Sequence, residues 1–179
     1  EVGNLEDDLP RLAEADWVIE SVKEDMGIKK DLLGKAAPHI GPYAILSTNT
    51  SWLSLHEMAE VLPDELRPRF LGTHFFNPPR YMKLLELVPT RHSDPGVVDW
   101  VTRFSNERLG KGVVPAKDTP NFIANRIGVH SLMTALALVD KFGLSVEEVD
   151  AITGPALARP KTATFKLCDL IGLDTLLFV

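Results

Sequence analysis

Short apolar segments alternate with amphipathic segments in the first part of the chain, and this alternation restricts the fold more than any other feature. Residues 16–22 (DWVIESV) and 43–51 (YAILSTNTS) are apolar runs rich in β-branched and aromatic side chains. Each is followed by a stretch with apolar residues at helical spacing, over residues 23–40 and 53–62. Two successive strand–helix units predict an open, mostly parallel α/β sheet.

Two further strands are predicted over residues 69–76 and 83–89, on either side of a turn with two consecutive prolines, NPPRYM. A helix over residues 94–109 and a short strand over residues 110–117 complete this part of the chain. The α/β class is therefore expected to extend to residue 117.

The pattern changes beyond that point, where no convincing strand occurs. Thr119 followed by Pro120 has the form of a helix N-cap with proline at the first helical position, and helical spacing continues to Gly143. The S-x-x-E pattern at residues 145–148 is a capping box that opens another helix. The rest of the chain is therefore expected to be helical.

This change predicts two domains, an α/β domain over residues 1–117 and an all-helical domain over residues 118–179. The chain starts with EVGNLEDDLP and has no initiating methionine. We therefore expect it to be an interior fragment of a longer protein.

The charge and the cysteine content exclude several functions. The chain has a net charge of −6 without a basic cluster, so neither nucleic acid nor an anionic membrane surface is an expected partner. Cys168 is the single cysteine, no histidine pair has metal-ligand spacing, and no apolar run would span a bilayer. We expect a cytoplasmic protein without a disulfide, a metal or a membrane segment.

His74 and Glu86 lie symmetrically about the proline-containing turn. If the flanking strands pair as antiparallel neighbours, the two side chains face each other. A carboxylate in the apolar run of residues 84–88 is costly to bury without a partner, and an imidazole would be that partner. A histidine held in this way can act as a general base. The same spacing also fits a structural histidine beside a solvated glutamate.

Two other polar features are candidates for ligand binding. Asn49 and Ser51 follow a predicted strand, where ligands bind in open α/β sheets, and either side chain could hold a cofactor amide or a substrate oxygen. The same residues could instead form an Asx or Ser/Thr turn before the next helix. Asn125 faces the apolar side of its predicted helix and needs a partner, which is either a backbone group of the sheet domain or a ligand.

Four motifs occur in order along the chain: STNTS, GTHFFNPPRYMKLLELV, KDTPNFIANR and DLIGLDT. Together they resemble the 3-hydroxyacyl-CoA dehydrogenase family over nearly the whole chain. The resemblance implies the C-terminal part of a Rossmann-type doubly wound sheet that binds NAD, followed by an all-helical domain that supports dimerisation, with both domains truncated. It also implies NAD-dependent oxidation of (S)-3-hydroxyacyl-CoA to 3-oxoacyl-CoA in fatty-acid β-oxidation.

The resemblance also assigns roles by motif position. His74 resembles the catalytic base, and Glu86 resembles the acid that orients it. Ser51 and Asn125 resemble residues that hold the substrate oxygen. The residues that match positions in contact with NAD are Glu24, Lys29, Asn49 and Asn77.

The sequence departs from the family pattern in two places. The turn GxGxxG is absent, so this chain alone is expected to bind NAD poorly or not at all. Residues 159–167 (RPKTATFKL) replace a PMGPF-like stretch and resemble larger bacterial β-oxidation proteins fused to an enoyl-CoA hydratase. The implied partners are an acyl-CoA substrate, a second copy of the chain, a fused hydratase unit and a thiolase.

Two other functions compete with this one. A dehydrogenase-like module without catalysis would serve for binding or oligomerisation, and other β-hydroxyacid or sugar-nucleotide dehydrogenases share the architecture. A merely structural descendant has no physical need for His74, Glu86, Ser51 and Asn125 together, so this set favours an enzyme. The pairing of HFFNPP with LLELV argues against the other dehydrogenases.

Overall fold

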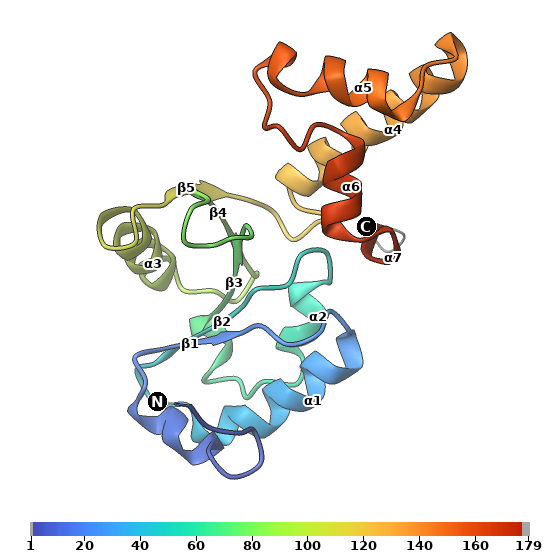
Figure 1. The fold of residues 1–179 in the computed structure, drawn as a ribbon. Helices are drawn as coiled ribbons and strands as arrows, with labels where there is room; N and C mark the ends of the chain where they lie inside the picture. Colours follow the sequence, from blue (N-terminus) through green and yellow to red (C-terminus); the bar gives the residue numbers. More distant parts are fainter. Residues whose placement is uncertain (1, 177–179) are drawn as a thin grey trace. The chain divides into compact units, whose positions relative to one another are not determined.

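The computed structural model describes residues 2–176 and divides into two compact units, Glu1–Phe122 and Ile123–Val179 (Figure 1). The domain limits drawn from the sequence stay a prediction. Residues 177–179 of the predicted helical domain lie outside the described residues.

The first unit is built on a five-stranded sheet. In sheet order, which is also chain order, its strands are β1 (Trp17–Glu20), β2 (Ile45–Thr48), β3 (Phe70–Phe75), β4 (Leu84–Pro89) and β5 (Gly112–Pro115). β1, β2 and β3 are parallel, whereas β4 is antiparallel to β3 and parallel to β5. The predicted α/β class, with a mostly parallel sheet, is confirmed.

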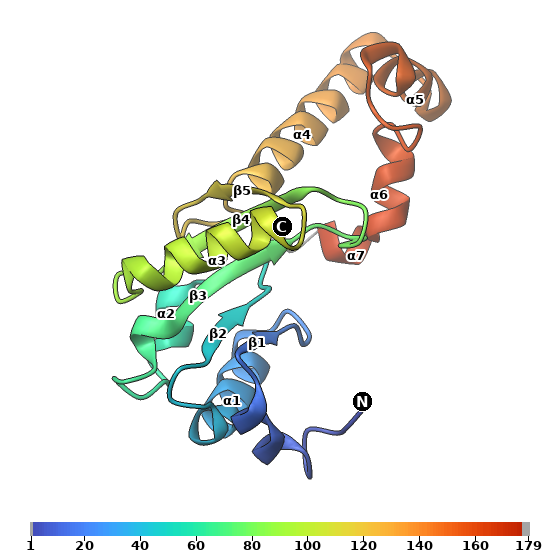
Figure 2. The same ribbon diagram turned by 90° about the vertical axis from the view of Figure 1, so that its left-hand side faces the viewer.

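Three helices cover the two faces of this sheet: α1 (Met26–Ala36), α2 (Leu55–Ala59) and α3 (Pro95–Glu107). α1 and α2 lie on one side, and α3 lies on the other (Figure 2). Neighbouring strand residues therefore face different helices, because side chains alternate along a strand. Leu46 packs with α1 and α2, for example, whereas Ile45 packs with α3.

Short 3₁₀ helices complete the first unit at η1 (Leu9–Glu14), η2 (Ala37–His39) and η3 (Arg67–Arg69). The longer helices begin at aspartate caps. Asp25 accepts from the N–H of Ile28 at the start of α1, and Asp94 accepts from the N–H of Gly96 at the start of α3. Each cap satisfies donors that have no partner inside the helix.

The second unit is helical, as predicted. Its elements are α4 (Ala124–Phe142), α5 (Val146–Thr153), η4 (Pro155–Leu157), α6 (Phe165–Ile171) and α7 (Leu173–Leu176). Gly143 ends α4 in the left-handed conformation at φ 62°, a common way to close a helix. Ser145 and Glu148 form the predicted capping box at the start of α5. No helix among residues 2–176 is long and apolar enough to cross a membrane.

The predicted start of α4 is wrong. Thr119 is not an N-cap and Pro120 is not helical, because Asn121 and Phe122 adopt positive φ angles of 63° and 44°. The Phe122 side chain is buried in the core beside α1 and α2, so this turn serves packing of the first unit. The helix begins at Ala124.

Asp150 connects α5 to the start of α6 in the second unit. Its carboxylate accepts from the backbone N–H groups of Thr164, Phe165 and Lys166, at 3.1, 2.7 and 3.1 Å. Burial acts to raise the pKa of Asp150, but these hydrogen bonds and the Lys166 ammonium outweigh it and hold the pKa below its usual value.

We expect Asp150→Asn to lower the free energy of unfolding by about 1 kcal/mol at pH 7, because the amide keeps one acceptor oxygen but loses the charge that strengthens these hydrogen bonds. Because the pKa of Asp150 is lower in the folded state, its ionised carboxylate stabilises the fold fully at pH values above the unfolded pKa of about 3.9. This contribution disappears as the pH falls through the folded pKa. The difference from wild type in urea unfolding, followed by circular dichroism, should therefore shrink as the pH falls below the unfolded pKa of about 3.9. Asp140→Asn, at an exposed position of α4, is the matched control. Equal destabilisation at both pH values would contradict the role of the carboxylate.

Candidate active site

His74 and Glu86 form a buried pair between β3 and β4. The antiparallel register places the two residues directly opposite each other, and Nδ1 of His74 lies 2.8 Å from Oε2 of Glu86. Their exposed fractions are 4% and 1%. The prediction that the two side chains meet is confirmed.

The geometry fixes which ring nitrogen is free. An ionised carboxylate accepts hydrogen bonds and cannot donate them, so Nδ1 of His74 carries the proton of the neutral ring. Among the described residues the ring makes no other hydrogen bond, which leaves Nε2 to accept a proton. This arrangement is the one that a general base requires.

Aromatic side chains surround the imidazole. The ring centroids of Phe76 and Phe122 lie 4.5 and 5.6 Å from that of His74. Apolar walls at this distance exclude water and strengthen the interaction of the imidazole with the Glu86 carboxylate. The turn at residues 119–122, which displaces the start of α4, thus places an aromatic wall beside the predicted base.

The loop that follows β2 lies at the carboxyl edge of the same sheet. The side-chain oxygen of Asn49 accepts from the N–H of Phe75 at 2.9 Å, so it links the end of β2 to the end of β3 and leaves the NH₂ group as a donor. Thr48 and Thr50 make the local turn, since their hydroxyls accept from the N–H groups of Thr50 and Leu53. Thr48 and Thr50 thus form the expected Ser/Thr turn, whereas ligand binding by Asn49 and Ser51 stays a prediction.

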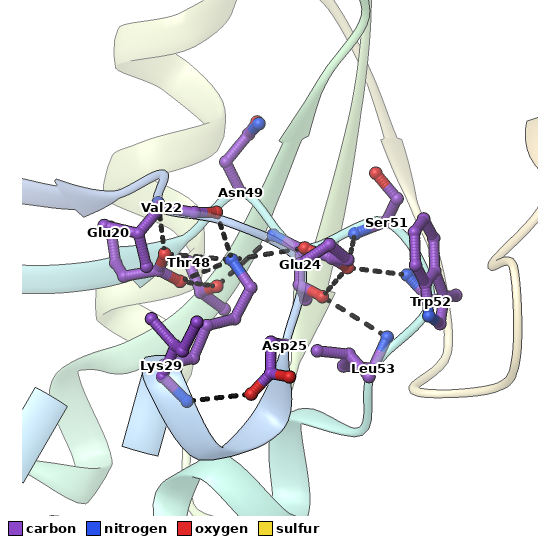
Figure 3. A network of polar contacts seen from close by, with 12 residues as sticks. Glu20, Val22, Glu24, Asp25, Lys29, Thr48, Asn49, Ser51, Trp52 and Leu53 are labelled. Carbon is purple, nitrogen blue, oxygen red and sulfur yellow. Dashed lines mark hydrogen bonds and ion pairs between the residues drawn. The ribbon is translucent and has the colours of Figure 1, made fainter. Parts of the chain in front are cut away.

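Ser51 and Asn49 direct their side-chain ends away from the charged groups below the loop (Figure 3). The backbone N–H of Ser51 donates to Oε1 of Glu24 at 2.7 Å, while its hydroxyl makes no hydrogen bond within residues 2–176. A hydroxyl and an amide donor are thus presented together at the edge where α/β sheets bind ligands.

Lys29 and Glu24 have protein partners for their charged atoms. Lys29 is 1% exposed, and its ammonium contacts Glu20 at 2.9 Å, Glu24 at 3.2 Å and the Val22 carbonyl at 3.1 Å (Figure 3). Glu24 also accepts from Thr50, as well as from Ser51. Direct contact of Glu24 and Lys29 with NAD stays a prediction from the motif match.

Glu20 was not identified from the sequence, although a signal for it exists. It ends the apolar run DWVIE, and a carboxylate in such a run requires a partner when it is buried. The partner is Lys29, nine positions later. The reasoning that predicted the pairing of Glu86 applies equally to Glu20.

Asn77 lies in the turn between β3 and β4, next to a cis peptide bond with Pro78. Lys111 holds this turn, because its ammonium donates to the carbonyls of Met82, at 2.7 Å, and Pro79. The same ammonium lies 5.6 Å from the ring centroid of Phe75. The turn that carries Asn77 is therefore anchored to the start of β5.

Asn125 belongs to the second unit, in the first turn of α4, where it is half-buried. Its contact with a backbone group of the sheet domain or with a ligand stays a prediction. Within residues 2–176 no group of three or more His, Cys, Asp or Glu side chains has the geometry to hold a metal ion.

Two family models match the chain. The model described as "3-hydroxyacyl-CoA dehydrogenase, NAD binding domain" matches residues 1–119, and the model described as "3-hydroxyacyl-CoA dehydrogenase, C-terminal domain" matches residues 122–179. Together they account for nearly all of the sequence.

Similar proteins carry related names. A probable 3-hydroxyacyl-CoA dehydrogenase of Bacillus subtilis is 52% identical over 97% of this chain and 22% of that protein. A probable 3-hydroxyacyl-CoA dehydrogenase of Deinococcus radiodurans is 48% identical over 97% of this chain and 50% of that protein. A putative fatty acid oxidation complex trifunctional enzyme of Rickettsia felis is 42% identical over 98% of this chain and 24% of that protein. The chain therefore spans half or less of the length of these relatives.

Solved structures agree with the sequence comparisons. FadB2 of Mycobacterium tuberculosis has a TM-score of 0.86 and 34% identity, over 94% of this chain and 59% of that chain. The (S)-3-hydroxybutyryl-CoA dehydrogenase PaaH1 of Ralstonia eutropha has a TM-score of 0.85 and 31% identity, over 95% of this chain and 59% of that chain. The fold described above is shared with both structures.

We expect Lys111→Met to loosen the turn of residues 76–83, because two carbonyls lose their charged donor. Amide hydrogen exchange of this turn in the full-length protein should become about tenfold faster, the change that a loss of about 1.4 kcal/mol produces. Lys83→Met is the control, since the Lys83 side chain is exposed in the same turn. Equal exchange in the two variants would show that Lys111 does not anchor the turn.

Proposed function

The chain belongs to the 3-hydroxyacyl-CoA dehydrogenase family, and on this premise we propose that the protein oxidises (S)-3-hydroxyacyl-CoA to 3-oxoacyl-CoA with NAD in fatty-acid β-oxidation. The observation that carries the proposal is the buried contact between His74 and Glu86. It provides a positioned proton acceptor at the carboxyl edge of the sheet, where α/β enzymes bind their ligands.

His74 acts as the general base. Its Nε2 takes the proton of the substrate 3-hydroxyl, and the ring becomes an imidazolium. Glu86 stabilises that cation through Nδ1 and keeps the ring in one orientation. In the reverse direction the imidazolium returns the proton to the 3-oxo oxygen.

Bound NAD would supply the acceptor for the hydride that leaves C3 of the substrate. The donors at the sheet edge fit such a ligand, because the Asn49 amide can donate to a carboxamide or ribose oxygen. We assign cofactor contact to the four positions of the motif match, Glu24, Lys29, Asn49 and Asn77. The phosphate-binding turn GxGxxG is not among the residues of this chain.

Ser51 and Asn125 are assigned to the substrate oxygen. A hydroxyl and an amide donor that converge on the oxygen at C3 would stabilise the charge that develops there during proton transfer. Ser51 is supported by its place in the loop after β2, whereas Asn125 is supported by its place in the motif KDTPNFIANR.

The helical unit supports a proposal about assembly. α4 exposes large apolar side chains, among them Ile127 at 65% and Phe142 at 63%. Apolar surface of this kind is normally covered by another protein surface. We infer that this apolar surface of α4 mediates formation of a homodimer, and that the protein is cytoplasmic. The similarity to trifunctional enzymes supports fusion with other β-oxidation activities.

In the full-length protein, His74→Gln should lower kcat for acetoacetyl-CoA reduction by NADH by about 10² to 10⁴, the usual contribution of a general base. The thermal midpoint should change little, because glutamine can keep a hydrogen bond to Glu86. His92→Gln, at an exposed position, should retain wild-type turnover.

Turnover close to that of wild type in His74→Gln would reject the base assignment. If the wild-type full-length protein itself has no activity with this substrate pair, the chain is a dehydrogenase-like binding module.

A further inference from the structure

Glu20 is a buried carboxylate that the proposed reaction does not use. It ends β1 with an exposed fraction of 5%. Its two oxygens accept from the Lys29 ammonium at 2.9 and 3.1 Å, from the Thr48 hydroxyl at 2.5 Å and from the N–H of Val22 at 2.6 Å. Glu20 is thus fully satisfied by the protein and has no capacity left for a ligand.

Lys29 links Glu20 to Glu24, because its ammonium contacts both carboxylates. It lies in α1 between the two carboxylates, at 2.9 Å from one and 3.2 Å from the other. A buried ammonium requires such partners, because its desolvation is costly. Without the charge of Glu20, Lys29 would have a single carboxylate partner, and the position of Glu24 would no longer be set from the core.

Glu24 in turn holds the loop after β2. Its Oε1 accepts from the N–H groups of Ser51 and Trp52, at 2.7 and 3.3 Å, and from the Thr50 hydroxyl (Figure 3). Hydrogen bonds to an ionised acceptor are about twice as strong as neutral ones. Glu24 therefore holds the part of the loop around Ser51, whereas Asn49 is held separately by the N–H of Phe75.

We propose that Glu20 is a positioning residue for the dehydrogenase reaction: through Lys29 and Glu24 it fixes loop 49–54 and thereby the Ser51 hydroxyl. The effect on turnover rests on the proposed function, whereas the fixing of the loop rests on the contacts shown in Figure 3. The effect is expected to be large, because a displacement of about 1 Å at a reacting group can lower turnover about 10²-fold.

The test is Glu20→Gln in the full-length protein, which keeps the size of the side chain and removes its charge. We expect amide exchange at Ser51 and Trp52 to become at least about tenfold faster. With acetoacetyl-CoA and NADH, kcat should fall about tenfold or more, and the fall in kcat should exceed any change in KM for NADH.

Two variants separate positioning from stability. Val101→Ala removes buried volume on the α3 face of the sheet, away from the network, and should lower the thermal midpoint without changing kcat or the exchange at Ser51. Glu20→Gln combined with Lys29→Met removes both buried charges and should recover thermal stability, because no ammonium is left without its partner. Exchange at Ser51 should stay fast in this double variant, and exchange is its readout because Lys29 is itself a proposed NAD contact.

The proposal is overturned if loop exchange follows the thermal midpoint in all of these variants, or if Glu20→Gln leaves either kcat or the exchange at Ser51 and Trp52 unchanged. An inactive wild-type protein would refute the dehydrogenase function separately. Loop exchange would still decide whether Glu20 fixes the loop.

Discussion

A charge that is buried in a protein must have a partner, and this requirement determines the carboxyl edge of the sheet. Glu86 is buried against His74, and Lys29 is buried between Glu20 and Glu24. Removing the partner of a buried charge would leave that charge uncompensated in a medium of low dielectric constant. The side chains at this edge are consequently held in place by the core, before any ligand is bound.

The change of strand direction at β4 gives the first pair its geometry. In an antiparallel pair, residues opposite each other lie close enough for direct contact, so His74 and Glu86 meet without help from a third element. The second network uses parallel strands and reaches across them through side chains. Thr48 at the end of β2 donates to Glu20 at the end of β1. The two networks therefore brace adjacent parts of one edge by different means.

Much of this was predictable from the sequence, and the exceptions have physical causes. The alternation of segments predicted the α/β class, and symmetry about the proline turn predicted that His74 meets Glu86. The start of α4 was not predictable, because Thr119 and Pro120 have every local feature of a helix start while burial of Phe122 imposes a different backbone. Lys29 follows the helical spacing of apolar residues in α1, yet spacing alone does not show that a lysine is buried among carboxylates.

The loop after β2 is where the two networks meet. On the β3 side, Asn49 is bound to the N–H of Phe75, the residue next to His74. On the β1 side, Ser51 is bound to Glu24, and through it to Lys29. A displacement of β1 relative to β3 would therefore strain this loop. His74 on β3 and the Ser51 hydroxyl on the loop keep a fixed separation only if both of these hydrogen-bonded attachments hold. Preorganisation of this kind lets a site stabilise a transition state without reorganising during the reaction.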